Sequence, residues 1–367
     1  MLTLKRLHNF SAGPGAVPDS VLALASQALE CLPNIPLSIL GVSHRSREFV
    51  AMVEELEDNL RQLIGLPADY ECVFLQGGGS LQFSMIPMNF LRGQALPAAY
   101  IDSGYWSHKA IKEARLEGTA EVVWSGESDA YVRLPEDHEL PADRDFSYLH
   151  YSSNETVEGL QYFREPACSA ATPRICDMSS DFLARPIDVT RYGMIYAHAQ
   201  KNLGPSGVSV CLIHKSLLER CPEGLHSMLD YRKHIGMHSA YNTPPVFAIY
   251  VVLLVTRWLR NDIGGLAAME QINRRKAALL YGTLATHPEF YRCRARLADR
   301  SLMNVAFTLP TAALEQQFVT EVEDAGFYGL GGHRSIGGLR ASLYNPVTEA
   351  SVTALTEFMS DFAQRHG

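Results

Sequence analysis

Apolar and polar residues follow two different periods along this chain, and these periods predict alternating helices and strands between about residues 20 and 260. From Ser46 to Ile64, apolar residues recur every three or four positions, which is the stripe of an amphipathic helix. Asp19 or Ser20 could cap an earlier helix that reaches Leu32. The run from Val246 to Val255 is too short to span a membrane, and its apolar residues at helical spacing predict a buried core helix.

Seven short runs between these helical segments have the character of strands. Several of them are apolar on both faces, as expected of strands that helices cover on both sides. The seven predicted strands are Glu71–Gln76, Ala99–Asp102, Glu121–Trp124, Tyr148–Ser152, Arg174–Asp177, Met194–Ala197 and Val208–His214. We therefore expect an α/β fold whose large domain is built on a mostly parallel, doubly wound, seven-stranded sheet.

The pattern changes after Ile263, where the sequence Asn-Asp-Ile-Gly-Gly of residues 261–265 interrupts a helical run. The elements predicted beyond this break are a helix (Leu266–Leu284), a strand (Leu302–Leu309), a helix (Ala312–Ala325), a glycine-rich stretch (Gly326–Gly338), a strand (Leu339–Leu343) and a final helix (Glu349–Arg365). We expect residues 16–262 to form the large domain, and residues 1–15 and 263–367 to form a smaller α/β domain.

Composition and charge restrict the partners of the chain. Its formal net charge is -8, so no whole-chain attraction draws it to nucleic acid or to an anionic membrane. Any anion must be bound by a local group of basic residues. The seven cysteines are scattered without a C-x-x-C pair, which argues against a disulfide framework and a zinc knuckle. The first residues lack the apolar run of a signal peptide, and we expect a cytoplasmic protein.

Three motifs at predicted strand ends carry candidate chemistry. Residues 76–80 read Gln-Gly-Gly-Gly-Ser and precede a helical run. The backbone N–H groups at such a helix start can bind a phosphate. A strand-to-helix turn without a ligand also needs small residues, so this alternative stays open. Asp177 could pair with the ring nitrogen of pyridoxal phosphate, or form a helix cap or an Asx turn. Lys201 could form a Schiff base, or be a solvated loop lysine.

The order of these three motifs favours the functional interpretation of each. One large group of pyridoxal-phosphate folds presents its functional parts in the same order: a glycine-rich phosphate-binding turn, an aspartate at a strand end, and a lysine at a later strand end. Metal chemistry finds less support, because no H-E-x-x-H is present and the histidines His44, His150, His198 and His333 lack the spacing of metal ligands. No G-x-S-x-G nucleophile elbow occurs either. We therefore expect a pyridoxal-phosphate enzyme without a metal site.

A series of motifs, in order from near residue 9 to the C-terminus, resembles the phosphoserine aminotransferase family, which belongs to the class-V aminotransferases of fold type I. The motifs are Phe10-Ser-Ala-Gly-Pro14, Ser43-His-Arg-Ser46, Gly77-Gly-Gly-Ser-Leu-Gln-Phe83, Gly104-Tyr-Trp106, Tyr151-Ser-Ser-Asn-Glu-Thr156, Ala199-Gln-Lys-Asn-Leu-Gly204, Tyr241-Asn-Thr-Pro-Pro245, Gly332-His-Arg334 and Gly338-Leu-Arg-Ala-Ser342. The resemblance implies the fold of pyridoxal-phosphate-dependent transferases of type I.

The resemblance also implies roles for individual residues. Lys201 and Asp177 would be catalytic, as the Schiff-base lysine and the partner of the pyridine nitrogen. The residues implied to contact pyridoxal 5'-phosphate are Gly79, Ser80, Trp106, Thr156, Asp177, Gln200, Lys201, Asn242 and Thr243. Those implied to bind substrate are His44, Arg45, His333 and Arg334 at the distal acid group, and Arg340 at the α-carboxylate. Asn242 and Thr243 would reach the cofactor of the other subunit, so a homodimer with shared active sites is implied.

The implied reaction moves an amino group between L-glutamate and 3-phosphohydroxypyruvate, giving O-phospho-L-serine and 2-oxoglutarate for serine biosynthesis. The family also acts on the 4-phosphohydroxythreonine pair of pyridoxine biosynthesis. Ala12 and Ser80 stand where some members have serine and arginine, which leaves the preferred distal group open. The alternatives are a paralogous aminotransferase for another phosphorylated or acidic amino acid, a cysteine desulfurase, and a non-catalytic binding protein.

Overall fold

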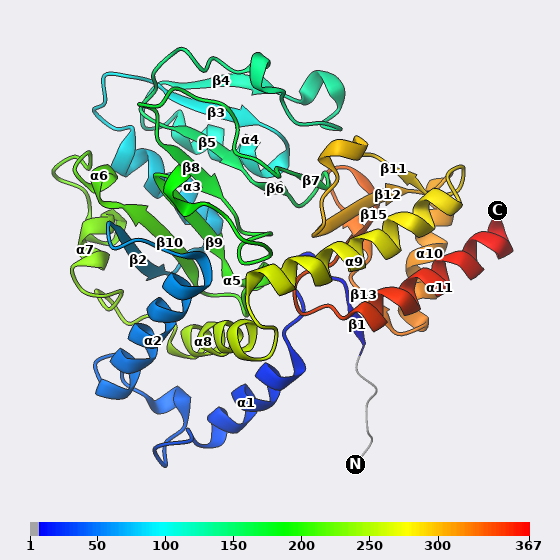
Figure 1. The fold of residues 1–367 in the computed structure, drawn as a ribbon, viewed down its shortest axis with the longest axis horizontal. Coiled ribbons are helices and arrows are strands. Elements are labelled where there is room, and N and C mark those ends of the chain that lie inside the picture. Colours follow the sequence, from blue (N-terminus) through cyan, green and yellow to red (C-terminus); the bar gives the residue numbers. More distant parts are fainter. Residues whose placement is uncertain (1–6) are drawn as a thin grey trace.

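The computed structural model describes residues 7–367 and shows a larger and a smaller α/β unit side by side (Figure 1). The larger unit contains a seven-stranded sheet in the order β2-β10-β9-β8-β5-β3-β4. Its strands are β2 (Tyr70–Leu75), β3 (Ala98–Asp102), β4 (Ala120–Ser125), β5 (Leu149–Ser152), β8 (Arg174–Asp177), β9 (Met194–His198) and β10 (Ser209–His214). Strand β10 runs antiparallel to β2 and β9, and the other pairs are parallel. The predicted mostly parallel sheet is confirmed.

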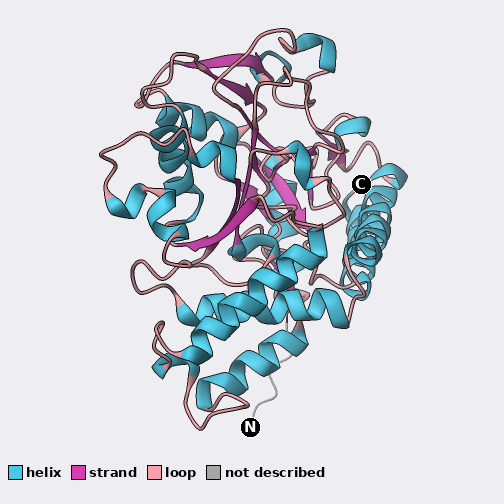
Figure 2. Ribbon diagram, turned by 60° about the vertical axis from the view of Figure 1, so that its left-hand side comes forward, coloured by secondary structure: helices cyan, strands magenta, loops and turns pink. Residues whose placement is uncertain are grey.

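Helices cover both faces of this sheet, as Figure 2 shows. One face carries α3 (Gly78–Phe90), α4 (Tyr105–Ala114), α6 (Lys215–Leu218) and α7 (Tyr231–Ile235), and the other carries α1 (Asp19–Glu30), α2 (Arg47–Ile64) and α8 (Val246–Asn261). Successive residues of β2 point to opposite faces, so Val73 and Leu75 join the core under α3 and α4, whereas Phe74 joins the core under α2 and α8. A short hairpin of β6 (Asn154–Glu155) and β7 (Leu160–Gln161) was not predicted.

The helix boundaries follow local signals, with one exception. Ser46 caps α2, because its hydroxyl accepts the backbone N–H of Phe49 at 3.3 Å, and Gly65 ends the helix in the left-handed conformation that glycine tolerates. The prediction that Asp19 or Ser20 caps α1 is wrong. Pro18 occupies the cap position and Asp19 is already helical, since the fixed φ of proline suits a helix start.

Helix α8 is buried along most of its length, as its apolar pattern predicts. It packs against α1 and α2 and shares one core with the large sheet (Figure 1). Among residues 7–367, no helix is both long and apolar enough to cross a membrane.

The smaller unit is built on a four-stranded antiparallel sheet in the order β11-β12-β15-β14. Its strands are β11 (Arg292–Cys293), β12 (Asn304–Thr308), β14 (Gly331–His333) and β15 (Gly337–Ser342), and its helices are α9 (Leu266–Thr286), α10 (Ala312–Asp324) and α11 (Glu349–His366). Helix α9 contributes Leu266 to the core of the larger unit and Leu280 to the core of the smaller one. The domain boundary near residue 262 stays a prediction.

The N-terminal segment packs against the smaller unit, whose residues come much later in the sequence. Strand β1 (His8–Asn9) pairs in parallel with β13 (Phe327–Tyr328), which lies within the glycine-rich stretch. Phe10 is fully buried in the core of the smaller unit. Residues 1–6 of the predicted small domain lie outside the described residues.

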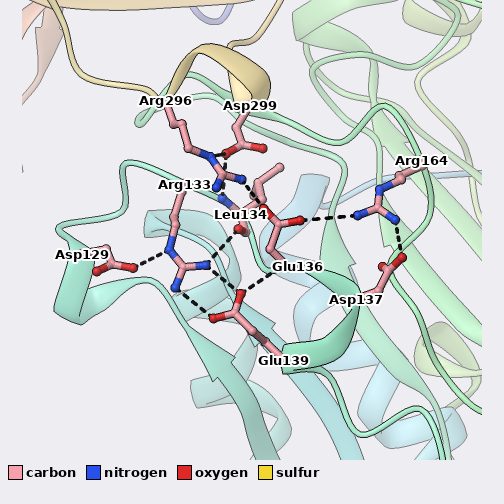
Figure 3. A network of polar contacts seen from close by, with 9 residues as sticks. All are labelled: Asp129, Arg133, Leu134, Glu136, Asp137, Glu139, Arg164, Arg296 and Asp299. Atoms are coloured by element: carbon pink, nitrogen blue, oxygen red, sulfur yellow. Dashed lines mark hydrogen bonds and ion pairs between the residues drawn. The ribbon is translucent and has the colours of Figure 1, made fainter.

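An ion-pair network connects the two units at the surface (Figure 3). Arg296, from the smaller unit, donates to Glu136 of the larger unit at 2.8 Å and to Asp299 at 2.7 Å. The backbone N–H of Arg296 also donates to the carbonyl of Val132 at 2.7 Å. These contacts fix the segment around Glu136 to the smaller unit.

Candidate active site

A cavity of about 310 Å³ lies at the carboxyl ends of the parallel strands, where open α/β sheets place their ligands. Asp177 ends β8 and His198 ends β9, and both side chains line the cavity. The smaller unit closes the opposite side with His333 of β14 and Arg340 of β15. The two units therefore build one site between them.

Lys201 enters this cavity from a single helical turn, α5 (Ala199–Asn202), directly after β9. Its Nζ donates to Thr156 Oγ1 at 2.7 Å and lies 5.1 Å from the centroid of the Trp106 ring. Burial lowers the pKa of Lys201, although the carboxylate of Asp177 acts in the opposite direction. A lowered pKa brings this amine closer to the neutral form that a nucleophile requires.

The carboxylate of Asp177 is oriented by its own turn. Oδ1 accepts the backbone N–H of Ser179 at 2.8 Å and the Ser179 hydroxyl at 2.5 Å. Asp177 therefore forms the Asx turn that the sequence left open as an alternative. It also lines the cavity. The turn leaves Oδ2 available to a group inside the cavity.

Helix α3 begins at the cavity, immediately after β2. Gly77 precedes it with a φ of 88°, a left-handed conformation that favours glycine. The backbone N–H groups of the first turn have no acceptor within the helix, and together with the helix dipole they favour an anion. Gly78, Gly79 and Ser80 line the cavity at this point.

The smaller unit contributes cationic and aromatic groups. Arg340 Nη1 donates to the carbonyl of Thr156 at 3.1 Å, and burial lowers the pKa of its guanidinium. The ring of His333 lies 4.5 Å from that of Tyr105, and burial, with the charge of Arg340, lowers the pKa of its imidazole. These groups face the cavity from the side opposite to α3.

Comparison with known proteins assigns the family. The family model described as aminotransferase class-V matches residues 7–355. The chain is 43% identical over 362 residues to the phosphoserine aminotransferase of Rhodopirellula baltica, covering 99% of this chain and 96% of that protein. It is 46% identical over 363 residues to that of Halalkalibacterium halodurans, covering 99% and 100%. The chain belongs to the phosphoserine aminotransferase family.

Solved structures agree with this assignment. The phosphoserine aminotransferase of Bacillus circulans subsp. alkalophilus superposes with a TM-score of 0.95 at 43% identity, covering 99% of each chain. A pyridoxal-phosphate-bound phosphoserine aminotransferase from Trichomonas vaginalis superposes with a TM-score of 0.90 at 35% identity, covering 97% of this chain and 100% of that one. This chain is therefore a class-V aminotransferase with the fold of type I.

Nine of the site residues predicted from the sequence of this member of the phosphoserine aminotransferase family line the same cavity. They are Gly79, Ser80, Trp106, Thr156, Asp177, Gln200, Lys201, His333 and Arg340. They come from segments spread over more than two thirds of the chain, and the fold brings them together. Their individual roles stay predictions.

The other five predicted residues lie outside this cavity in the single chain. His44 lines a separate depression with Cys72 and Met237, and Arg45 and Arg334 are exposed. Asn242 Nδ2 donates to Gln76 Oε1 at 3.0 Å, and the carbonyl of Thr243 accepts from Gln76 Nε2 at 2.8 Å. Their assignment to a site shared between two subunits stays a prediction.

Sequence reasoning missed two buried glutamates on either side of Thr156. Glu155 accepts the backbone N–H groups of Ser107 at 3.1 Å and Trp106 at 3.3 Å, and Glu158 accepts that of Tyr105 at 3.0 Å. Together they bind the start of α4 and fix the position of Trp106. Burial raises the pKa of both carboxyls. Glu155 lies within the motif Tyr151–Thr156, but no local pattern predicts that either glutamate is buried.

Histidine 198 was also missed as a site residue. It lines the cavity with only 5% of its surface exposed. The signal was present in the sequence, because His198 directly follows the predicted strand Met194–Ala197 and thus shares the strand-end position of Lys201.

Proposed function

We propose that this protein transfers an amino group between L-glutamate and 3-phosphohydroxypyruvate with pyridoxal phosphate as cofactor, giving O-phospho-L-serine and 2-oxoglutarate. The observation that carries the proposal is the cavity itself. Lys201, Asp177 and the start of α3 face Arg340 and His333 across it. The first three groups suit a phosphorylated aldehyde cofactor, and the last two suit an acidic substrate.

The residues of the cavity fit pyridoxal phosphate. Buried polar atoms in folded proteins nearly always have a hydrogen-bond partner, yet Trp106 Nε1, His198 Nε2 and Arg340 Nε have none among the described residues. The volume of about 310 Å³ is at the lower end of small-molecule sites. Lys201, Asp177, Trp106, Thr156, Gly79, Ser80 and Gln200 would hold the cofactor, which supplies an electron sink for the charge that develops at the substrate Cα.

The chain's own groups would position the substrate and move its protons. The amine of Lys201 would carry the proton to and from the substrate Cα, and Thr156 Oγ1 orients that amine. The carboxylate of Asp177 would hold a proton on the ring nitrogen of the cofactor. Arg340, held by the carbonyl of Thr156, would bind the α-carboxylate as a bidentate pair.

The distal acid group of the substrate would bind to His333 together with Arg334, His44 and Arg45. Arginine forks suit both a phosphate and a carboxylate, so one site serves phosphoserine and glutamate. Because His44 and Arg45 do not line the cavity of their own chain, we propose that a second subunit supplies them, along with Asn242 and Thr243. The homodimer is supported by leucines exposed around α1 and the turn that follows it, namely Leu22, Leu24, Leu29, Leu37 and Leu40.

A substrate panel tests the proposal. The purified protein with pyridoxal phosphate is supplied with 2-oxoglutarate and one amino donor at a time, and the formation of glutamate is measured. We expect kcat/KM to be highest with O-phospho-L-serine, above aspartate, O-phosphothreonine and cysteine. Turnover of another amino acid without turnover of phosphoserine would favour the paralogous aminotransferase, and sulfide release from cysteine would favour the desulfurase.

A further inference from the structure

His198 is a buried histidine with one ring nitrogen already engaged and the other without a partner. Nδ1 lies 3.0 Å from the hydroxyl of Ser209, the first residue of β10, whose backbone pairs with that of His198. Nε2 is buried and has no hydrogen-bond partner among residues 7–367. An unpartnered buried polar atom costs free energy, so a ligand group that meets Nε2 would recover that cost.

The free nitrogen points at the first turn of α3. A methyl group placed on Gly79 would lie 2.2 Å from His198 Nε2 and 2.9 Å from its Cδ2, so the imidazole edge lies against the backbone of this turn. The same turn presents backbone N–H groups that have no acceptor within the helix. His198 Nε2 and the helix start thus converge on one point of the cavity wall.

We infer that His198 is a ligand of the cofactor phosphate, which its Nε2–H binds together with the first turn of α3. This inference rests on the proposed function, because it takes the phosphate to be that of pyridoxal phosphate. Ser80 is part of the same turn and offers only a short hydroxyl side chain. His198 therefore adds a donor at a place where the helix start itself carries no cationic side chain.

The protonation of His198 suits this role. Burial lowers the pKa of His198 to about 4, although the carboxylate of Asp177 acts in the opposite direction, so the ring is neutral near neutral pH. When the Ser209 hydroxyl donates to Nδ1, the single ring proton is on Nε2, and that nitrogen can donate to a phosphate oxygen. Ser209 is then a positioning residue that selects the tautomer.

The contact between His198 and the phosphate can be tested by comparing the binding of pyridoxal phosphate with that of pyridoxal, which lacks the phosphate. A general effect on the site would weaken the binding of both compounds. Apoprotein is titrated with each compound, and the dissociation constants are read from cofactor absorbance. For His198→Ala we expect pyridoxal phosphate to bind about 10- to 100-fold more weakly, the loss of one hydrogen bond to a charged group. Pyridoxal should bind within about two-fold of the original protein, and Ser209→Ala should show a smaller loss of the same kind.

His150→Gln is the matched control. His150 is another buried histidine, its Nε2 lies 2.8 Å from the hydroxyl of Tyr196, and it does not line the cavity. Its replacement should leave the ratio of the two dissociation constants unchanged. The phosphorus NMR signal of bound pyridoxal phosphate should shift in His198→Ala and not in His150→Gln, which provides a readout that is independent of activity.

Each outcome decides a different question. Equal losses for pyridoxal phosphate and pyridoxal, or no loss for either, would overturn the assignment of His198 and leave the proposed function standing. Failure of the unmodified protein to bind pyridoxal phosphate would refute the proposed function itself. If His198→Ala does not fold, His198→Gln and nitrogen NMR of histidine-labelled protein replace it. The Nε2–H signal should then move with pyridoxal phosphate and stay in place with pyridoxal.

Discussion

The surroundings of Lys201 lower the pKa of its amine, as the reactivity proposed for it requires. Its amine is held between the Thr156 hydroxyl and the Trp106 ring, in the wall of the cavity. The lowered pKa of Lys201 follows from its burial, whereas an exposed lysine keeps its proton near neutral pH. Chemistry at this residue therefore depends on the walls of the cavity as much as on the amine.

Replacement of Lys201 tests this view directly. Lys201→Ala should abolish the covalent adduct that borohydride traps, and it should lower kcat by about a thousand-fold or more, because Lys201 is the one lysine among the described residues that line the cavity. Mass spectrometry after reduction detects the adduct. Lys215→Ala, on the exposed surface beside Glu71, is the control and should keep it. An adduct that survives in Lys201→Ala would show that a different lysine binds the cofactor.

Glu158 should make the stability of the protein depend on pH. Burial raises the pKa of Glu158 to about 8, whereas in the unfolded chain it is about 4.3. Folding therefore takes up a proton between these values, and the free energy of unfolding should fall as pH rises through this window, by at most about 1.4 kcal/mol per pH unit. Glu158→Gln should flatten this dependence.

Urea denaturation of both proteins at pH 5, 6.5 and 8 measures the difference. Glutamine can still accept the N–H of Tyr105 at the start of α4, so the variant should keep the helix. Parallel curves for the two proteins across this range would mean that Glu158 is ionised in the folded state.

At the scale of elements, the packing of α3 against β9 leaves no space for a side chain at Gly79. Gly79→Ala should weaken the binding of pyridoxal phosphate, because the new methyl group would overlap the His198 imidazole, whereas the backbone conformation at this position does not itself require glycine. Adding His198→Ala should relieve the overlap and restore part of the affinity. A double-mutant cycle on the dissociation constant measures this coupling. Strictly additive losses would contradict the contact.

The elements that the sequence predicted well are those with strong local patterns. Arg174–Asp177 was predicted to the residue, and the amphipathic helix α2 begins one residue after its predicted start. The run Val246–Val255 was correctly predicted as a buried helix, but α8 continues to Asn261. Strands β13 and β14 were not predicted and lie within the glycine-rich stretch Gly326–Gly338, because their conformation depends on pairing with distant strands. His8 bonds to Ser351, 343 residues away, and no local signal reports such a contact.

The same distinction separates the predicted from the missed site residues. Lys201 and Asp177 follow recognisable strands, so their position at the sheet edge could be inferred before the structure. Strand β15 and helix α3 meet at the cavity because of the way the two units pack. The spacing of apolar residues along the sequence does not predict this packing. Glu155 and Glu158 are buried and bind the start of α4, which lies about 50 residues earlier in the sequence.

At the scale of the whole molecule, the exposed leucines around α1 predict how two chains associate. Leu40, between α1 and α2, is 70% exposed, more than Leu22, Leu24, Leu29 or Leu37, and it is the last of these leucines in the sequence. Leu40→Asp should weaken the proposed dimer at least about ten-fold, because a buried charge at an apolar interface is costly. Sedimentation equilibrium measures the association. Transamination should fall in proportion to the monomer formed, since Asn242 and Thr243 are proposed to act across the interface.

Leu116→Asp is the control for this experiment. Leu116 is 76% exposed but follows α4, outside that surface, so its replacement should leave association and activity unchanged. A fully active Leu40→Asp monomer would contradict the shared site.

The pairing of β1 with β13 has a consequence for the synthesis of the chain. His8 and Phe10 leave the ribosome early, but their partners in the smaller unit, such as Ser351, follow 343 residues later. At about 5–20 residues per second, this delay is on the order of half a minute. The large sheet can form during that interval while Phe10 has no core to enter. The backbone N–H of Gly15, which bonds to the carbonyl of Gln200 next to Lys201, links this waiting segment to the cavity. The cavity is therefore completed only after His333 and Arg340 have been translated, long after Lys201.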